Sequence, residues 1–238
     1  MFPLHDDNPR HGTPLITLAL IAVNLLVFVY ELTLPPGALE DLFHSFGFIP
    51  ARFSGEVQLV TDGHVVGGVW LTPITSMFLH AGWMHVVGNM WMLWLFGDNV
   101  EDRFGHLRFL IFYLACGLGA TALHHLTATA SEIPTVGASG AISGVMGAYF
   151  LLFPRARITT LVFLFFLVDL VQIPAVVFLG LWILIQVVSG SMTLGSAGDV
   201  GGVAFWAHVG GFGAGILLLP FMLIGRSVPR TALWRRHG

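Results

Sequence analysis

Long apolar runs separated by short polar segments dominate this chain. A membrane-spanning helix needs about 20 mostly apolar residues. Six runs approach or reach that length: Pro14 to Leu34, Trp83 to Phe96, Leu107 to Leu126, Ser139 to Phe153, Ile173 to Val188 and Val203 to Ile224. The pattern predicts an all-α integral membrane protein built as a six-transmembrane-helix bundle. The first run is too long for the apolar region of a signal peptide, so we expect an uncleaved span.

Two further apolar stretches fall outside these runs. Residues 158–170 are apolar, but Asp169 interrupts them and Pro174 follows. This leaves two interpretations open: a connection that lies along the membrane, or an early part of the fifth span. Residues 35–79 form a long predicted loop that is rich in aromatic and aliphatic side chains. Exposed apolar patches of that size are rare, so we expect this loop to be buried or to lie at the membrane interface.

The composition agrees with a membrane protein. Hydrophobic residues make up 55% of the chain and charged residues 10%, whereas soluble domains carry about 25% charged residues. Cys116 is the single cysteine, so an internal disulfide is impossible. The arginines are scattered and leave no basic face, which predicts no nucleic-acid partner.

The arginine positions predict the orientation. Positive charge in short loops lies on the cytoplasmic side, and all ten basic residues here are arginines. With both termini cytoplasmic, Arg52 is the one arginine left outside. The predicted organisation is therefore a cytoplasmic tail (1–13), a six-helix membrane domain (14–225) and a second cytoplasmic tail (226–238).

Four polar side chains lie at similar depths in the predicted spans. Each is costly inside a membrane and needs an explanation. Counted from the cytoplasmic ends at about 1.5 Å per residue, Ser139 lies about 24 Å up, His208 about 27 Å, and His85 about 20 to 24 Å. Asn89 follows His85 one turn deeper on the same face. In a hydrocarbon core about 30 Å thick, this coincidence predicts one shared site.

Small residues allow the fourth and sixth spans to approach closely. Gly140 and Gly144 lie on the fourth span, and Gly211 and Gly215 on the sixth. Faces with a small residue at every fourth position let membrane helices pack backbone against backbone. We therefore expect these spans to bring Ser139 within hydrogen-bonding distance of His208.

Such a contact permits acyl transfer. A serine hydroxyl becomes nucleophilic when a base takes its proton, and a histidine can be that base. Neither span carries an acidic residue, and the nearest candidates for a third member, Asp169 and Asp199, lie elsewhere. We therefore expect a Ser-His dyad.

An oxyanion formed at Ser139 would need hydrogen-bond donors. The candidates are the Ser139 backbone N–H, His85 and Asn89, and the glycines at 137 and 140 would let the backbone approach the reacting group. Each residue also has a plainer interpretation. The serine could serve helix packing, the histidine could lie at the membrane interface, and the polar pair on the second span could bond neighbouring helices.

Taken together, these residues and their spacing resemble those of a known family, the rhomboid intramembrane serine proteases. The motifs that carry the resemblance are "GASG" at 137–140, "AHVGGFGAG" at 207–215, "HVVGN" at 85–89 and "GDNVEDRFG" after the second run. They occur in order on the expected spans, and the resemblance covers about residues 14–225.

The resemblance implies a six-helix rhomboid-like bundle. Ser139 would sit at the top of a short fourth span, facing a water-filled cavity open to the extracytoplasmic side. By this resemblance Ser139 is the nucleophile, His208 the base, and His85, Asn89 and the Ser139 amide the oxyanion hole. The substrates would be single-span membrane proteins, cleaved within or near their spans, and no metal or other cofactor is implied. We expect a multi-pass protein of a bacterial or archaeal cell membrane, in contact with the lipid bilayer; its oligomeric state is left open.

Two departures from the family pattern stand out. Many members carry a Trp-Arg pair before the "TSMFLH" stretch, but here Leu71 follows Trp70. Some members also have an aromatic residue one turn after the serine that stacks on the catalytic histidine; Ser143 occupies that position here. The sequence therefore does not predict which residue holds the His208 ring in place.

Two other functions are alternatives. A rhomboid-like protein that binds transmembrane clients without cutting them would be marked by loss of the serine or the histidine, and both are present. A small transporter or channel would need inverted repeats or broken helices near the midplane, and no corresponding pair of segments shows them. Among the other histidines, His80 with His85 and His124 with His125 have spacings that do not place two ligands on one helix face, so we expect no metal site.

Overall fold

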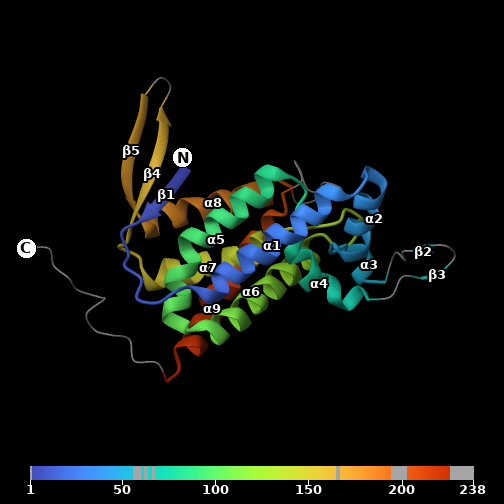
Figure 1. The fold of residues 1–238 in the computed structure, drawn as a ribbon, viewed down its shortest axis with the longest axis horizontal. Helices are drawn as coiled ribbons and strands as arrows, with labels where there is room; N and C mark the ends of the chain where they lie inside the picture. Colours follow the sequence, from blue (N-terminus) through green and yellow to red (C-terminus); the bar gives the residue numbers. More distant parts are fainter. Residues whose placement is uncertain are drawn as a thin grey trace, which may run out of the picture.

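The structure, a computed structural model, describes residues 2–55, 60–61, 64–65, 68–164, 167–193 and 203–225. Most of them are helical (Figure 1). The long helices are α1 (Leu15–Thr33), α2 (Pro36–Phe46), α5 (Trp83–Phe104), α6 (His106–Thr127), α7 (Ser139–Leu152), α8 (Ala175–Thr193) and α9 (Phe205–Leu223). Short helical turns are α3 (Pro50–Phe53), η1 (Val69–Leu71), α4 (Thr72–Thr75) and η2 (Ser76–Phe78). The strands are β1 (Phe2–Asp6), β2 (Val60–Thr61), β3 (His64–Val65), β4 (Arg157–Leu164) and β5 (Leu167–Pro174).

Each of the six predicted apolar runs coincides with a helix: α1, α5, α6, α7, α8 and α9. Among the described residues, α1, α6, α8 over Ala175–Met192, and α9 are long and apolar enough to cross a membrane. Helix α7 is apolar but shorter, at 14 residues. The protein is therefore a mostly helical integral membrane protein, while the count of six spans and the orientation of the termini stay predictions.

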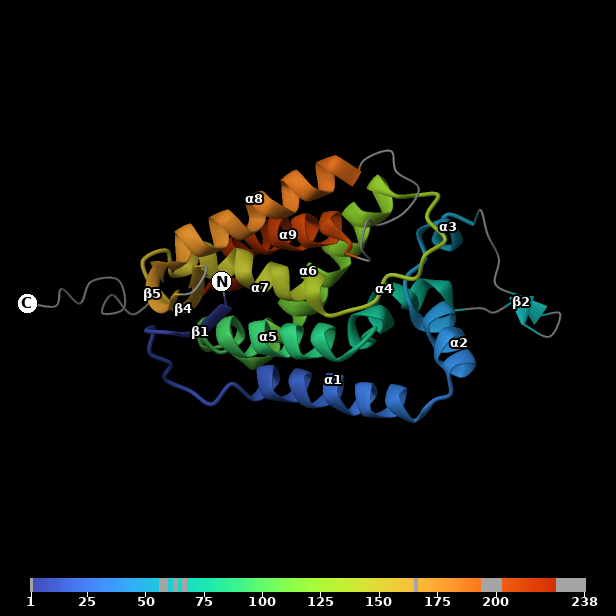
Figure 2. The same ribbon diagram turned by 90° about the horizontal axis from the view of Figure 1, so that it is seen from above.

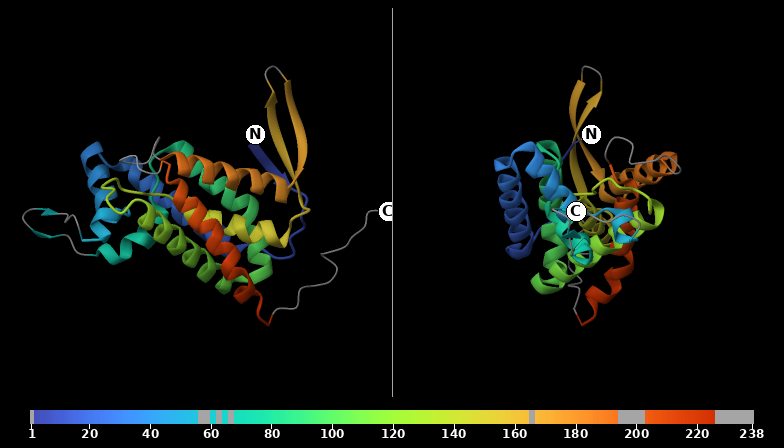
Figure 3. Two further views of the ribbon diagram at one scale, coloured as in Figure 1. Left: turned by 180° about the vertical axis from the view of Figure 1, so that it is seen from behind. Right: turned by 90° about the vertical axis from the view of Figure 1, so that its right-hand side faces the viewer.

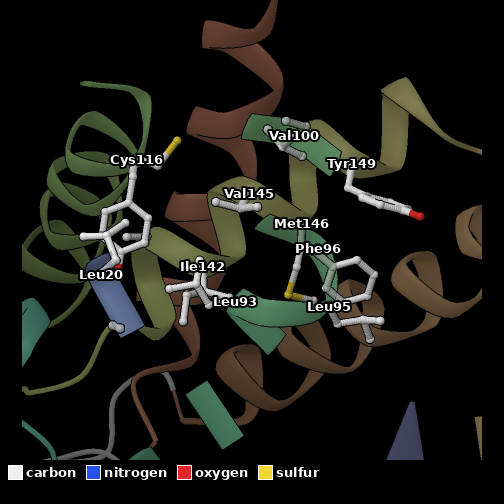
Figure 4. Packing of buried hydrophobic residues seen from close by; sticks show 14 of the residues in the cluster. Leu20, Leu93, Leu95, Phe96, Val100, Cys116, Ile142, Val145, Met146 and Tyr149 are labelled. Carbon is white, nitrogen blue, oxygen red and sulfur yellow. The ribbon is translucent and has the colours of Figure 1, made fainter. Parts of the chain in front are cut away.

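Helix α7 occupies the centre of the bundle. It packs against α5, α6 and α9, with α1 outside α5 and α8 outside α9 (Figure 2). Ten consecutive residues of α7, from Gly140 to Tyr149, are buried. Figure 4 shows Ile142, Val145 and Met146 of α7 within the hydrophobic core. A helix buried on all sides is expected to be apolar on all its faces. This burial explains why the short run has the composition of a membrane span.

Glycines set the close contact between α7 and α9. A Cβ atom at Gly211 would collide with the carbonyl oxygen of Gly140, and one at Gly215 would collide with that of Gly144. On its other side, Gly144 lies against Cys116 of α6. The backbones of α7 and α9 therefore lie in contact at these glycines, which positions the N-terminal ends of the two helices side by side.

Glu101 of the "GDNVEDRFG" motif binds the N-terminal end of α1. The buried carboxylate of Glu101 accepts hydrogen bonds from the backbone N–H groups of Ile16 and Thr17 at 2.8 and 2.7 Å, and from the Thr17 hydroxyl at 2.7 Å. The first N–H groups of a helix lack intrahelical partners. Glu101 supplies those partners and fixes α1 against α5.

Residues 158–164 and 167–170 are not an early part of the fifth span, and whether they lie along the membrane stays a prediction. They fall within β4 and β5, an antiparallel hairpin, and α8 begins only at Ala175. This stretch contains many β-branched residues, which favour strands. The hairpin projects away from the helices at one end of the bundle, whereas α2 to α4 lie at the other end (Figures 1 and 3).

Part of the predicted N-terminal tail joins this hairpin. Strand β1 pairs with β4 in the order β1-β4-β5. The Asp6 carboxylate accepts hydrogen bonds from the hydroxyl of Tyr149 on α7 and from the amide of Asn99 on α5, the latter at 3.2 Å. Burial raises the pKa of Asp6 to about 6. The N-terminal residues are thus hydrogen-bonded to the C-terminal end of α7, the helix that begins at Ser139.

The predicted long loop is buried in part, while Trp70 and Leu71 are exposed. Its described part is largely helical, and Phe48, Ile49 and Met77 are buried. Phe48 also pairs with Thr135 through two backbone hydrogen bonds of 3.0 and 2.8 Å. These bonds hold the loop against the segment that leads into Ser139.

Candidate active site

The N-terminal ends of three helices meet at the predicted site. His85 and Asn89 lie near the start of α5, Ser139 is the first residue of α7, and His208 lies in the first turn of α9. Helix N-termini carry partial positive charge and unpaired N–H groups. This end of the bundle is therefore suited to stabilise negative charge that develops on a bound group.

Ser139 and His208 lie in contact. The Ser139 Oγ and His208 Nε2 atoms are 2.9 Å apart, and both residues are partly buried. The glycine packing described above brings their helices to this separation. A hydroxyl within hydrogen-bonding distance of an imidazole nitrogen is the arrangement that general-base activation of a serine requires.

His85 and Asn89 face the backbone just before Ser139. A Cβ atom placed on Gly137 would lie 2.6 Å from His85 Nε2 and 3.5 Å from Asn89 Nδ2. Gly137 also has a positive φ of 122°, which a residue with a side chain rarely adopts. Glycine at 137 therefore meets two demands, because it permits both the turn and the close approach of these side chains.

The Asn89 side chain has an unused donor. Its Nδ2 atom is buried and has no hydrogen-bond partner among the described residues. A buried donor without a partner costs free energy, so such groups often have a functional explanation. An oxyanion bound beside Gly137 and Ser139 would supply the missing acceptor.

Ser143 lies where some family members carry an aromatic residue, and it does not contact His208 as a ring would. Its hydroxyl donates a 2.6 Å hydrogen bond to the Ser139 carbonyl oxygen. Of the candidate third members, Asp169 lies on β5, and Asp199 lies outside the described residues.

The sequence interpretation missed two residues on α8. Gln186 Oε1 lies 2.8 Å from His208 Nδ1. One turn earlier, the Trp182 ring lies 5.7 Å from the His208 ring, centroid to centroid, with 36° between the planes. The cost of a polar residue in a membrane helix was the signal that could have identified Gln186, since it is the amide side chain within an otherwise apolar run.

Comparison with known proteins gives a consistent result. A family model described as the rhomboid domain matches residues 67–225. That segment includes α5 to α9 and all four residues of the candidate site.

Individual relatives show the same similarity. The chain is 32% identical over 140 residues to rhomboid protease GluP of Bacillus subtilis, covering 58% of this chain and 25% of that protein. It is 45% identical over 75 residues to RHOMBOID-like protein 6, mitochondrial, of Arabidopsis thaliana, covering 32% and 24%. It is 28% identical over 170 residues to Rhomboid protein 1, mitochondrial, of Saccharomyces cerevisiae, covering 70% and 45%. The matched segments thus span about a quarter to a half of these relatives.

Proposed function

The chain belongs to the rhomboid family, and we propose that it is an intramembrane serine endopeptidase that cleaves single-span membrane proteins within or near their transmembrane segments. The observation that carries the proposal is the 2.9 Å separation of Ser139 Oγ and His208 Nε2. The similarity to a Bacillus subtilis protein named rhomboid protease GluP supports the same reaction. A client-binding protein without activity would have no need for this contact.

In the proposed reaction, the Ser139 oxygen attacks the carbonyl carbon of the scissile peptide bond. The serine proton moves to His208 Nε2, and the carbonyl oxygen becomes an oxyanion. The Asn89 amide, His85 and the Ser139 backbone N–H donate hydrogen bonds to that oxygen. Donors of this kind stabilise the transition state more than the ground state, and losing one typically costs about 100- to 1000-fold in rate.

The tetrahedral intermediate then collapses. The C–N bond breaks, His208 gives its proton to the leaving amine, and the acyl group stays on Ser139. A water molecule next attacks the ester carbonyl while His208 takes a proton from it. The ester bond to Ser139 breaks, the serine recovers its proton, and the carboxylate product leaves.

The proposal includes a topology. With both termini cytoplasmic and six spans, the site end of the bundle faces the extracytoplasmic side, and the Asp6 and Glu101 end faces the cytoplasm. The arginine distribution supports this orientation, and the described arginines Arg103, Arg108, Arg155 and Arg157 lie near the Glu101 end. Arg10 lies at the same end, where its guanidinium is 3.7 Å from the Asp98 carboxylate. The other four predicted cytoplasmic arginines lie in 226–238, outside the described residues.

Cleavage of a single-span reporter by the protein in detergent tests the proposal. Wild type should cut the reporter, and Ser139→Ala should abolish the cut. Ser191→Ala is a matched control, because Ser191 is exposed and its hydroxyl donates a hydrogen bond to the Val187 carbonyl of its own helix. Cleavage that persists in Ser139→Ala would refute the assignment of the nucleophile. Binding of the reporter without cleavage by wild type would favour the client-binding alternative.

A further inference from the structure

The fifth apolar helix carries one polar side chain into the candidate site. Gln186 of α8 is 8% exposed, and its Oε1 atom lies 2.8 Å from His208 Nδ1. The helix around it is strongly apolar, with isoleucine on either side of Leu184 and valines at 187 and 188. A buried amide in such a helix costs free energy unless it is hydrogen-bonded, and here its partner is the imidazole.

The bond to Gln186 selects one tautomer of His208. A glutamine carbonyl oxygen can only accept a hydrogen bond, so the proton of the neutral imidazole must lie on Nδ1. The lone pair is then on Nε2, the nitrogen that faces Ser139 Oγ at 2.9 Å. The opposite tautomer would place N–H toward the serine and could not take its proton.

Trp182 restricts the same ring from a second direction. It lies one helical turn before Gln186, on the same face of α8. Its ring approaches the His208 ring with a centroid distance of 5.7 Å. Ser143 of α7 cannot provide a ring contact, and its hydroxyl bonds to the Ser139 carbonyl. The ring contact with the imidazole therefore comes from Trp182 of α8 and not from position 143 of α7.

We propose that Gln186 is a positioning residue that holds His208 in the tautomer and orientation required for it to accept the Ser139 proton, with Trp182 limiting rotation of the ring. This inference rests on the proposed protease function. Gln186 contacts the imidazole of His208 and acts through it. Its loss should therefore slow the proton transfer of the chemical step and leave substrate binding unchanged. Loss of a group that acts only in the chemical step lowers kcat and leaves KM nearly unchanged.

Two substitutions separate positioning from packing. Gln186→Met keeps the volume and removes the acceptor, whereas Gln186→Glu keeps an acceptor oxygen at the same place. We expect Gln186→Met to lower kcat about 10- to 100-fold with KM within about twofold, which is a part of the roughly 100- to 10,000-fold that a general base contributes as a whole. Gln186→Glu should recover most of kcat at alkaline pH. Its half-maximal pH should move upward by about one unit or more, because a carboxylate stabilises the protonated imidazole.

These outcomes decide the inference. A Met variant with wild-type kcat would overturn it, and so would a Glu variant that is as impaired as the Met variant or that has a wild-type pH profile. Thermal unfolding in detergent serves as the folding control. If the wild type and the Gln186→Met variant both cleave the reporter normally, the role of Gln186 is refuted and the protease function stands. If the wild type does not cleave the reporter, the proposed function itself is refuted.

A measurement on the unaltered protein covers the case in which the variants fail to fold. Nitrogen NMR of protein labelled at histidine, with the His208 signals assigned by their loss in His208→Ala, reports the tautomer directly. The inference predicts a protonated Nδ1 and an unprotonated Nε2 above the pH at which the ring is charged. The reverse assignment would contradict it, whether or not the protein is an active protease.

Discussion

Gly211 of α9 lies directly against the carbonyl oxygen of Gly140 of α7, one residue after the candidate nucleophile. A methyl group at position 211 has no space, so Gly211→Ala must push the two helices apart. Overpacking of this kind typically costs about 1 to 3 kcal/mol, and it would also lengthen the contact between Ser139 and His208. We expect a lower unfolding temperature in detergent and a loss of most reporter cleavage.

Gly213→Ala is the matched control for that prediction. A Cβ atom at Gly213 meets nothing within 4 Å, and the residue lies on the same helix as Gly211. Alanine has the higher helix propensity, so stability should stay equal or rise slightly and cleavage should be retained. Equal behaviour of the two variants would show that close packing of α7 on α9 does not set the site.

Asn89→Ala tests the oxyanion donor. Because Asn89 Nδ2 has no partner among the described residues, its removal should not lower the unfolding temperature. Turnover should slow by about 10- to 1000-fold, the range for loss of one oxyanion donor. The opposite pattern, with normal turnover and reduced stability, would assign Asn89 to bonding between helices.

Glu101→Ala should destabilise the protein at the end of the bundle far from Ser139. The substitution leaves two backbone N–H groups of α1 without the carboxylate that they now contact. Each unsatisfied buried group costs about 1 to 3 kcal/mol, so we expect the free energy of unfolding to fall by about 2 to 5 kcal/mol. Glu40→Ala, at an exposed position on α2, should have little effect in the same unfolding measurement.

Asp6 should make stability depend on pH. Burial raises the pKa of its carboxyl from 3.8 to about 6, so the folded protein favours the protonated form. The contribution to stability is then full below about pH 3.8 and is lost as the pH rises through about 6. Asp6→Asn should remove this component, so the wild-type unfolding temperature should fall relative to that of the variant as the pH rises from 4 to 7. Parallel curves over that range would contradict the raised pKa.

The helices and the site could be predicted from sequence to different extents. The six apolar runs each contain a helix because length and hydropathy are local properties of the chain. The Ser139–His208 contact was also predictable, since two faces of small residues indicate which helices approach closely. The ends of the helices were less accurate: α5 continues to Phe104, past the predicted Phe96, because polar residues at a membrane surface can stay helical.

The hairpin and the support for His208 were not predictable in the same way. Residues 158–164 and 167–170 are apolar enough for a helix, and only the pairing of β4 with distant β1 and with β5 makes them strands. Gln186 lies 22 positions before His208. Its polarity within an apolar helix is unusual, but the sequence does not predict which residue it contacts. Such a contact depends on the rotation of α8 about its own axis, which periodicity within an apolar helix does not define.

The most direct test of the central claim is covalent labelling with a serine-reactive fluorophosphonate, followed by mass spectrometry of the labelled peptide. The account predicts an adduct on Ser139 in the wild type, with none in Ser139→Ala and almost none in His208→Ala. An adduct on a different serine, or labelling of Ser139 at the wild-type rate without His208, would contradict it.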